Sequence, residues 1–531
     1  MSYYQKYLKY KNKYLSLVKL YQQRGNGENF SWFLNETELN QQEEDELEEK
    51  YNNGNVDVIT FRGIDYTVEN AYYINGGNKL IRQQKILIIP DEALLFEELK
   101  NCAEKIGVTL RVAGGWVRDK IIGLPNDDID IAIDIMSGKD FSEHLFVYIN
   151  SLGNGWVCHK PAIIAANAAK SKNLETATLK LRLPNGLEFE LDFVGLRSEV
   201  YDEHSRVPII KEATPPEDAG RRDLTINSLF YNINTGLVED YMGGVRDIKR
   251  KVIRTPLDPM KTFSEDPLRM LRALRFLARF QFNLDDGIRR TMQNRALQSL
   301  LATKVSKERI GKEIEGFFKG SSVPFLAFRE IHENRLWNAI FGGDSDWGNE
   351  SIELLGRLED KTEITVLSAL TLPLANMDKR SPPVTRKDPT RVQNFYLVNL
   401  KLRKILLEIS ETIHRCIFSA LNLSPDIKSW RRSEIALIKF DAGDYFINAL
   451  NIIKAINPNI YTNILQFVEI HKINNEEIEH IKKKFNGDKV IQGFKVEPKS
   501  LGSLLKKLLI WNIDNPSGTF EEALSLKAEF L

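Results

Sequence analysis

The hydrophobic positions of this chain follow two spacings, one in its middle part and another from about residue 263 onward. Between residues 86 and 233, short runs in which apolar and polar side chains alternate indicate strands, and helical stretches separate them. The predicted strands cover residues 85–90, 109–115, 128–135, 177–183, 187–195 and 225–233. Further on, apolar positions recur at helical spacing, as in 266–280, 307–318 and 403–423. The pattern therefore predicts an α+β head followed by a long all-α region.

The flanking segments suggest further boundaries. Residues 1–23 carry five lysines and no acid, and an acidic run over 36–49 follows, so we expect residues 1–85 to form an extension outside the main fold. A proline-rich basic stretch, 380–391, is typical of a loop or linker. The predicted domains are an extension over 1–85, a head over 86–250, a neck over 251–320, a helical body over 321–410 and a helical tail over 411–531.

Composition narrows the class of protein. The 531 residues include 73 Lys and Arg and 73 Asp and Glu, so the net charge does not indicate a nucleic-acid partner. Three cysteines argue against a disulfide scaffold and fit a reducing compartment. No apolar run approaches the ~20 residues of a membrane span, and the first residues lack the pattern of a secretory signal. We expect a cytoplasmic protein without a membrane partner, with nuclear or mitochondrial pools left open.

Two glycines follow a predicted strand and precede a predicted helix. The strand runs into Gly114 and Gly115, and the helix covers residues 116–122. Glycine lets a backbone approach a phosphate closely, and the first turn of a helix offers free N–H groups to an anion. A glycine pair also occurs in ordinary tight turns, so taken alone it favours that interpretation.

Acidic and apolar residues alternate in the next predicted strand. Asp128 and Asp130 fall on one face, because strand side chains point alternately to opposite sides. Strands usually avoid aspartate, and neighbouring carboxylates of this kind suit Mg²⁺, which prefers oxygen ligands. A second alternating strand, 187–193, supplies Asp192 as a candidate third carboxylate. We therefore predict Mg²⁺ as the cofactor, and solvated strand faces are the alternative.

Four motifs in order carry a resemblance to a known family. Residues 114–119 (GGWVRD) and 128–130 (DID) resemble the head of the polymerase-β-like nucleotidyltransferases. Residues 221–227 (RRDLTIN), 265–269 (EDPLR) and 308–313 (ERIGKE) are similar to motifs of the class II CCA-adding tRNA nucleotidyltransferases. The resemblance covers about residues 105–320. It implies a polymerase-β-like head, a small mixed sheet with helices, followed by an elongated all-α neck, body and tail.

The resemblance also implies an activity, which is the template-independent addition of C, C and A to tRNA 3′ ends from CTP and ATP. Trp116 and the stretch 174–181 most resemble the fungal and other eukaryotic members. The first 23 residues resemble a leader found on proteins of giant DNA viruses.

The same resemblance implies roles for head residues. Asp128 and Asp130 are expected to bind two Mg²⁺ ions, and Asp192 is expected to complete the catalytic carboxylates. Bound metals lower the pKa of the attacking 3′-OH and offset charge on the leaving pyrophosphate. Contacts to the phosphates are expected from Gly114, Gly115, Arg118 and Arg222, and contacts to the ribose from Asp223 and Asn227.

Asp266 and Arg269 are expected to select the base. Ser264 is a plausible N-cap and Pro267 suits a first turn, which would place Asp266 and Arg269 one turn apart on one helix. A carboxylate accepts from the exocyclic amine of C or A, whereas U and G present a carbonyl there. Arg272 is included among the expected nucleotide-binding residues. An ordinary ion pair between Asp266 and Arg269 is the structural alternative.

The polar stretch 197–218 fits the mobile loop with which this family switches from CTP to ATP, although an ordinary connector stays possible. The charges of residues 308–313 are expected to brace the selecting helix rather than to act in catalysis. The histidines and cysteines do not cluster at metal-ligand spacing, so we expect no zinc site.

Local charge indicates where tRNA would bind. Residues 244–275 hold nine bases and four acids, and residues 401–440 hold eight bases and four acids. Such patches suit contacts to phosphates, which position a nucleic acid without reading its sequence. The expected partners are tRNA, held by its acceptor stem and T arm, together with ATP and CTP, and a monomer is favoured.

Alternative functions stay open at this point. A poly(A) polymerase of the same family shares most of the motifs, and a CC-adding or A-adding specialist is also possible. A non-catalytic tRNA-binding protein with a decayed head is a third alternative. The absence of a long basic tail argues against the first, and the intact Asp128, Asp130, Arg222 and Arg269 argue against the last.

Overall fold

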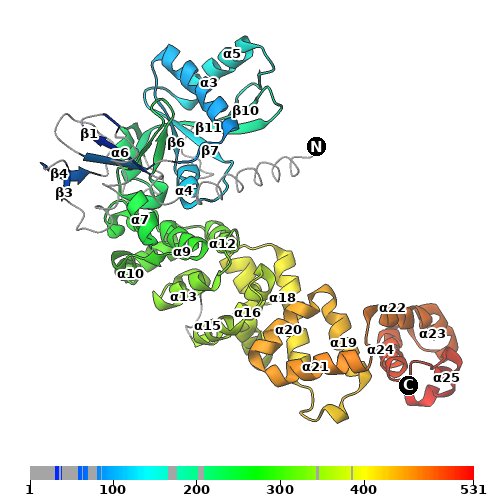
Figure 1. Cartoon of the computed structure of the whole chain (residues 1–531). Coiled ribbons are helices and arrows are strands. Elements are labelled where there is room, and N and C mark those ends of the chain that lie inside the picture. Colours follow the sequence, from blue (N-terminus) through cyan, green and yellow to red (C-terminus); the bar gives the residue numbers. More distant parts are fainter. Residues whose placement is uncertain are drawn as a thin grey trace. The chain divides into compact units, whose positions relative to one another are not determined.

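The computed structural model describes a chain of two compact units, Met1–Leu300 and Leu301–Leu531 (Figure 1). The described residues are 30–34, 37–38, 58–61, 64–69, 80–84, 86–164, 176–200, 209–342, 346–383, 385 and 387–530. The basic segment 1–23, most of the acidic run 36–49 and the middle of the polar stretch, 201–208, lie outside them.

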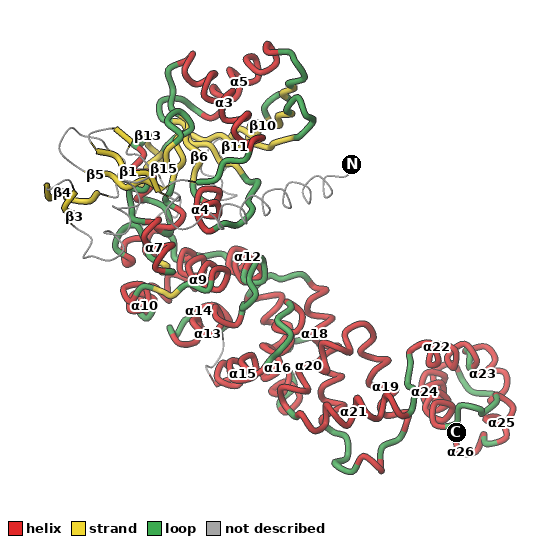
Figure 2. The backbone as a smooth tube through the Cα atoms, in the orientation of Figure 1, coloured by secondary structure: helices red, strands yellow, loops and turns green. Residues whose placement is uncertain are grey.

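The centre of the first unit is a mixed sheet in the order β15-β14-β6-β7-β11-β10-β8, with β9 paired to β10 (Figure 2). Neighbouring strands are antiparallel except β7 and β11, which run parallel. The strands are β6 (Leu110–Ala113), β7 (Ile129–Ile133), β8 (Val157–Cys158), β9 (Ala162–Ile164), β10 (Thr176–Arg182), β11 (Glu188–Gly195), β14 (Phe230–Asn232) and β15 (Leu237–Glu239). A mixed sheet of this kind was expected for the head.

Helices α3 (Pro90–Ile106) and α5 (Gly138–Leu152) cover one face of this sheet (Figure 1). Ile131 on β7 and Phe193 on β11 are register partners and are fully buried. The ring of Phe193 lies 5.3 Å from that of Phe141 on α5, so this face is the apolar one. Because side chains alternate along a strand, residues 130 and 192 point to the opposite face.

The first unit contains further elements, which lie between the strands of the central sheet along the chain or after them. Helix α4 (Gly115–Ile122) follows β6, and the chain after β11 forms the hairpin β12 (Arg197–Val200) and β13 (Ile209–Glu212). Further elements are α6 (Pro215–Gly220), η3 (Thr225–Asn227), α7 (Gly244–Arg250), β16 (Val252–Ile253), α8 (Pro259–Glu265), α9 (Leu268–Phe280), β17 (Asn283–Leu284), α10 (Asp286–Met292) and α11 (Arg295–Lys304).

A separate five-stranded sheet lies within residues 30–84, where no strands were expected. Its order is β2-β1-β5-β4-β3. The strands are β1 (Phe30–Leu34), β2 (Thr37–Glu38), β3 (Val58–Phe61), β4 (Ile64–Glu69) and β5 (Leu80–Gln84).

All elements of regular secondary structure in the described part of the second unit are helices, as the apolar spacing predicts. Its longer helices are α12 (Lys307–Gly316), α13 (Phe325–Glu333), α15 (Asp346–Arg357), α16 (Glu363–Arg380), α18 (Lys404–Leu421), α19 (Arg432–Ala442), α20 (Phe446–Ile456), α21 (Pro458–Ile470), α22 (Asn475–Lys484), α23 (Gly487–Phe494) and α24 (Pro498–Asp514). Shorter elements are α14 (Trp337–Phe341), α17 (Arg391–Gln393), η4 (Asn394–Asn399), η5 (Ile427–Ser429), η6 (Gly443–Tyr445), α25 (Phe520–Ser525) and α26 (Lys527–Phe530). Among the described residues, no helix combines the length and the apolar character that crossing a bilayer requires.

Three local expectations were wrong. The strand expected over residues 225–233 is shorter, because Thr225–Asn227 form the 3-10 helix η3 and only Phe230–Asn232 form β14. Residues 86–89 pair with no strand and lead directly into α3, whose first residue is Pro90. Ser264 does not cap a helix but lies inside α8, and α9 begins only at Leu268. Pro267 explains the break, because a proline disfavours helical geometry in the residue before it, and Asp266 is extended with φ −138° and ψ 100°.

Candidate active site

Three carboxylates gather on the open face of the central sheet. Asp130 on β7 and Asp192 on β11 are direct register partners, and Asp128 immediately precedes β7. The Asp192 carboxylate also accepts a hydrogen bond from the hydroxyl of Thr178 on the neighbouring strand β10, at 2.5 Å. The parallel pairing of β7 with β11 therefore brings together the acids of both predicted alternating strands.

The proximity of these acids disturbs their titration. Desolvation by the surrounding protein, together with the charges of Asp128 and Asp192, raises the pKa of Asp130 from 3.8 to about 6. The pKa of Asp128 is also raised, first by desolvation and then by the charges of Asp192, Asp127 and Glu190. The positive charge of Arg222 acts in the opposite direction on Asp130. Such a cluster favours a bound cation.

The carboxylates of this face suit Mg²⁺ as two of its ligands rather than as a complete set. Across the described ranges, no group of three or more His, Cys, Asp or Glu side chains is arranged to hold a metal ion by itself. Mg²⁺ in phosphate-transferring sites is usually bound by one or two carboxylates, and water and substrate phosphates complete its coordination. Asp128 and Asp130 fit that pattern, because they are exposed and their negative charges are poorly compensated.

The glycine turn lies directly beside this face. Gly114 ends the β6 strand with φ +67°, a left-handed conformation that L side chains rarely adopt. A Cβ at Gly114 would lie 2.8 Å from Nη1 of Arg222 and 3.2 Å from the carbonyl oxygen of Asn227. Glycine is therefore required at position 114 for two reasons: its backbone is left-handed, and the segment that follows α6 comes too close to leave room for a side chain.

Arg118 lies in the interior, below the turn. Its side chain is 4% exposed, and its Nε donates to Asp119 Oδ1 at 2.7 Å. An Nη group donates to the side-chain oxygen of Asn227, and the guanidinium lies over the rings of Phe276 and Phe280 on α9. Burial lowers the pKa of Arg118. In this structure the side chain joins α4 to α9, and its contact with a triphosphate stays a prediction.

Within residues 221–227, Asp223 is the centre of a buried polar network. The Asp223 carboxylate accepts from Nε of Arg272 at 2.7 Å and from Nδ2 of Asn227 at 3.0 Å. These partners outweigh desolvation and hold the pKa of Asp223 well below its usual range. Since Arg272 belongs to α9, the ion pair attaches this helix to the segment that carries residues 221–227. The nearby charge of Arg269 contributes to the same effect.

The predicted base-selecting pair has a different geometry from the one expected. Asp266 lies in the turn between α8 and α9, where its Oδ1 accepts from the backbone N–H of Leu268 at 3.1 Å. Arg269 is 8% exposed and donates to Glu265 Oε2 at 3.1 Å and to the carbonyl of Thr262 at 3.3 Å. The carboxylate thus contacts the first residue of α9, while the guanidinium donates to two residues of α8.

Sequence reasoning did not assign a role to Asp119, Asn126, Arg279 or Asp218, which organise this site. Asp119, 1% exposed, accepts from Asn126 at 2.8 Å and from Arg279 at 3.3 Å, in addition to Arg118. Asn126 in turn accepts from the backbone N–H of Asp128 at 2.9 Å. Asp218 holds both arginines of the 221–227 motif. The sequence does carry a signal for this contact, because Asp218 lies three and four residues before the two arginines, a spacing at which helical side chains are neighbours.

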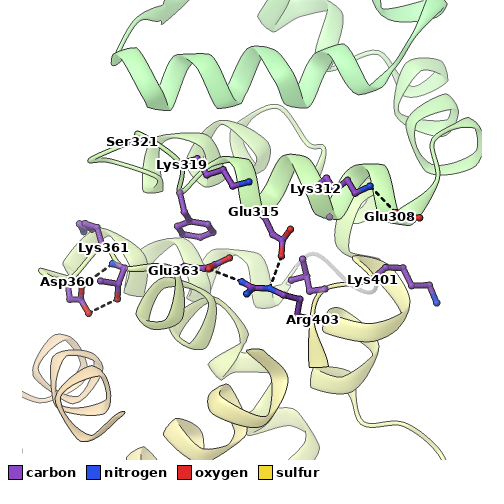
Figure 3. Close-up of a pocket in the computed structure, with 14 residues that line it drawn as sticks. Glu308, Lys312, Glu315, Lys319, Ser321, Asp360, Lys361, Glu363, Lys401 and Arg403 are labelled. Carbon is purple, nitrogen blue, oxygen red and sulfur yellow. Dashed lines mark hydrogen bonds and ion pairs between the residues drawn. The ribbon is translucent and has the colours of Figure 1, made fainter. Parts of the chain in front are cut away.

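The motif at 308–313 belongs to the second unit. Glu308 and Lys312 form an exposed i,i+4 ion pair at 3.0 Å. Exposed pairs of this kind contribute little to the free energy of unfolding. They line an open pocket of about 920 Å³, in which Arg403 pairs with Glu315 and Glu363, each at 3.4 Å (Figure 3). Its expected role in bracing the selecting helix stays a prediction.

The comparisons with known proteins place this site in a class. Residues 110–254 match the family model described as the poly A polymerase head domain. They contain the glycine turn, both aspartate strands and the 221–227 motif. The fold and the site therefore define a nucleotidyltransferase head of the poly(A) polymerase type.

The relatives narrow the class to a family. The chain is 30% identical to tRNA nucleotidyltransferase cca1 of Schizosaccharomyces pombe over 490 residues, which are 81% of this chain and 94% of that protein. It is 37% identical to cca2 of the same yeast over 295 residues, 55% of this chain but only 59% of that relative. The CCA-adding enzyme of Thermotoga maritima, solved with tRNA, shares the fold, with a TM-score of 0.57 and 20% identity over 83% of this chain and 96% of that one. The chain belongs to the tRNA nucleotidyltransferase family.

Proposed function

We propose that this protein adds C, C and A to tRNA 3′ ends from CTP and ATP without a nucleic-acid template. The observation that carries the proposal is the register of Asp130 against Asp192, with Asp128 and Arg222 beside them, on the open face next to the Gly114 turn. Family membership supports it, and the S. pombe relatives bear the name tRNA nucleotidyltransferase. CCA addition by a cytoplasmic, monomeric enzyme is the form we favour.

The carboxylates would hold divalent metal. Asp128 and Asp130 are the proposed ligands, and Asp192, anchored by Thr178, completes the negative cluster. Bound Mg²⁺ supplies activation of a hydroxyl and compensation of phosphate charge. Without a cation Asp130 takes up a proton at a higher pH than an ordinary aspartate does, since its pKa is raised to about 6.

The basic and polar groups beside the cluster would bind the nucleotide. Arg222 is one-fifth exposed and can donate charge-assisted hydrogen bonds to the triphosphate. Gly114 and Gly115 allow the phosphates to approach the backbone at the start of α4. Asp223, which stays ionised because of Arg272, can accept from a ribose 2′-OH and so favour ribonucleotides, with Asn227 beside it.

Base selection is proposed for the turn between α8 and α9. The Asp266 carboxylate can accept from the exocyclic amine that C and A share, whereas the carbonyl of U or G would face it acceptor to acceptor. Arg269 can donate to ring acceptors, and its contacts with Glu265 and Thr262 restrict its orientation. This pair explains the choice of C and A over U and G, while the order of addition requires a further change in the pocket.

The tRNA would contact basic surface outside the catalytic cluster. The positively charged segments 244–275 and 401–440 suit phosphate contacts, and the helical tail over 411–531 is the proposed binding region for the acceptor stem and T arm. The T. maritima relative was solved complexed with tRNA, which supports a tRNA partner here.

One assay separates the proposed function from its alternatives. Purified protein is incubated with Mg²⁺ and tRNA that ends at the discriminator base, and CTP and ATP are supplied singly and together. Extension by three nucleotides that then stops supports the proposal. A long A tract indicates a poly(A) polymerase, and extension that stops after two nucleotides indicates a CC-adding specialist. An A-adding specialist extends only tRNA that already ends in CC, so failure to extend either tRNA indicates a non-catalytic tRNA-binding protein.

A second experiment separates chemistry from binding. Asp128→Ala removes a proposed metal ligand from the exposed face, so we expect incorporation to be lost while tRNA affinity stays nearly unchanged. Filter binding and single-turnover extension measure the two quantities. Normal incorporation by Asp128→Ala would exclude the proposed metal site.

A further inference from the structure

Asp218 on α6 is a densely hydrogen-bonded carboxylate next to the candidate site, and no motif includes it. Its side chain is 2% exposed. Its Oδ1 accepts from Arg221 (Nη2 at 2.5 Å, Nε at 2.9 Å) and from the backbone N–H of Arg197 at 3.2 Å. Its Oδ2 accepts from Arg222 (Nη2 at 2.9 Å, Nε at 3.1 Å). One buried carboxylate therefore carries two guanidiniums, which lower its pKa against desolvation.

The contacts of Asp218 determine where Arg222 points. Nε and Nη2 of Arg222 are engaged side-on by Asp218, and Nη1 donates to the carbonyl of Asn227 at 3.1 Å. The guanidinium also lies 4.9 Å from the ring of Phe230 and fits against Gly114. Because Asp218 fixes the Nε and Nη2 edge of the guanidinium, the positive charge of Arg222 stays near Asp130, whose pKa it lowers.

Arg221 uses the same carboxylate for a different purpose. Its Nε donates to the carbonyl oxygen of Arg197 at 2.8 Å as well as to Asp218. Arg197 is the first residue of β12, so Asp218 and Arg221 bind both backbone groups of the residue where the β12–β13 hairpin begins. Arg221 therefore faces the hairpin, and Arg222 faces the carboxylate cluster.

We propose that Asp218 is a positioning residue that orients Arg222 to receive the triphosphate of the incoming nucleotide. The proposal rests on the proposed function, because it assigns the anion that Arg222 contacts. Without the negative charge of Asp218, two neighbouring guanidiniums repel each other and Arg222 is free to turn toward Asp130. An arginine paired with Asp130 no longer offers its charge to phosphates.

The test is Asp218→Asn, which keeps the shape of the side chain and removes its charge. We expect the KM values for CTP and ATP to rise by the same factor, about tenfold, with kcat changed by less than about threefold. Binding of inorganic tripolyphosphate in Mg²⁺, measured by calorimetry, should weaken by a similar factor, whereas tRNA affinity should not change. Unchanged tripolyphosphate affinity would overturn the proposal.

A double-mutant cycle distinguishes positioning through Arg222 from a general loss of structure. In an Arg222→Ala background, Asp218→Asn should weaken tripolyphosphate binding no further. Additive losses would overturn the proposal. Asp240→Asn is the matched control, because Asp240 is also a buried carboxylate of the head and accepts from the backbone N–H groups of Gly244 and Val245. This control should leave tripolyphosphate affinity at the parent value.

Two further results complete the design. Should Asp218→Asn not fold, Asp218→Glu provides the same test, because its extra methylene displaces both guanidiniums, and parent-like tripolyphosphate affinity would then refute the proposal. A parent protein that binds tripolyphosphate but extends no tRNA would exclude the proposed function and leave the role of Asp218 intact. A parent that binds no tripolyphosphate would overturn the positioning role itself.

Discussion

Neutralising Asp130 should stabilise the metal-free protein while it abolishes activity. In the folded chain the pKa of Asp130 is raised from 3.8 to about 6 by desolvation and by its neighbours Asp128 and Asp192. The folded state therefore binds the proton more tightly than the unfolded state does. As the pH rises from about 4 to about 6, the free energy of unfolding falls, and the whole cost is present at neutral pH.

The magnitude follows from the size of the shift. Two pKa units correspond to about 3 kcal/mol, since each unit is worth about 1.36 kcal/mol. Asp130 is exposed, however, so solvent screening reduces the effect, and we expect about 1 kcal/mol. Asp130→Asn should therefore raise the free energy of unfolding by about 1 kcal/mol at pH 7.5 in the presence of a chelator. This increase should disappear near pH 4.

Hydrogen exchange of the β7 segment, Ile129–Ile133, measures the opening free energy of the head without averaging over the helical unit. Asp134→Asn is the control on the same segment, because Asp134 accepts from the backbone N–H of Thr109 at 3.0 Å and its neutralisation should bring no gain. Added Mg²⁺ should stabilise the parent and not Asp130→Asn. An equal gain at pH 4 and pH 7.5, or no gain at all, would refute the electrostatic reasoning.

The other predictions concern the turn, the selecting helix and its anchor. Gly114→Ala should lower the free energy of unfolding, measured in urea, by about 1–3 kcal/mol, because it adds a close contact with Arg222 to a left-handed backbone. Gly107→Ala is the control: Gly107 has φ +70° and nothing within 4 Å of an added Cβ, so this variant should lose only the free energy of placing alanine in a left-handed backbone. Arg269→Ala should relax base choice more than it slows addition, and strict rejection of UTP and GTP by this variant in single-nucleotide extension would exclude the template role. Arg272→Ala leaves the Asp223 carboxylate without its ion pair and should destabilise the head by about 2 kcal/mol at pH 7. Since the pKa of Asp223 is held low in the folded state, this difference should shrink as the pH falls below about 4 in unfolding curves, and a pH-independent difference would contradict it.

Several local features were predictable because they depend on neighbouring residues alone. The alternation of Asp and Ile predicts a strand with its acids on one face, and β7 confirms it. Helical spacing predicts an all-α second unit, and the regular elements in its described part are all helices. The errors at 86–89 and Ser264 have local causes too, since an apolar run can precede a helix as well as form a strand, and a proline interrupts the pattern at Asp266.

The amino-acid sequence by itself determined the class of fold, the order of the motifs and most of the residues of the candidate site. Only the tertiary structure decided how these residues meet. It placed Asp192 opposite Asp130, joined Arg272 to Asp223, buried Arg118 and attached Arg221 and Arg222 to Asp218. The physical reason is that helix and strand periods fix only which side of an element a residue occupies, whereas strand pairing and the need to satisfy buried charges fix which residues become neighbours.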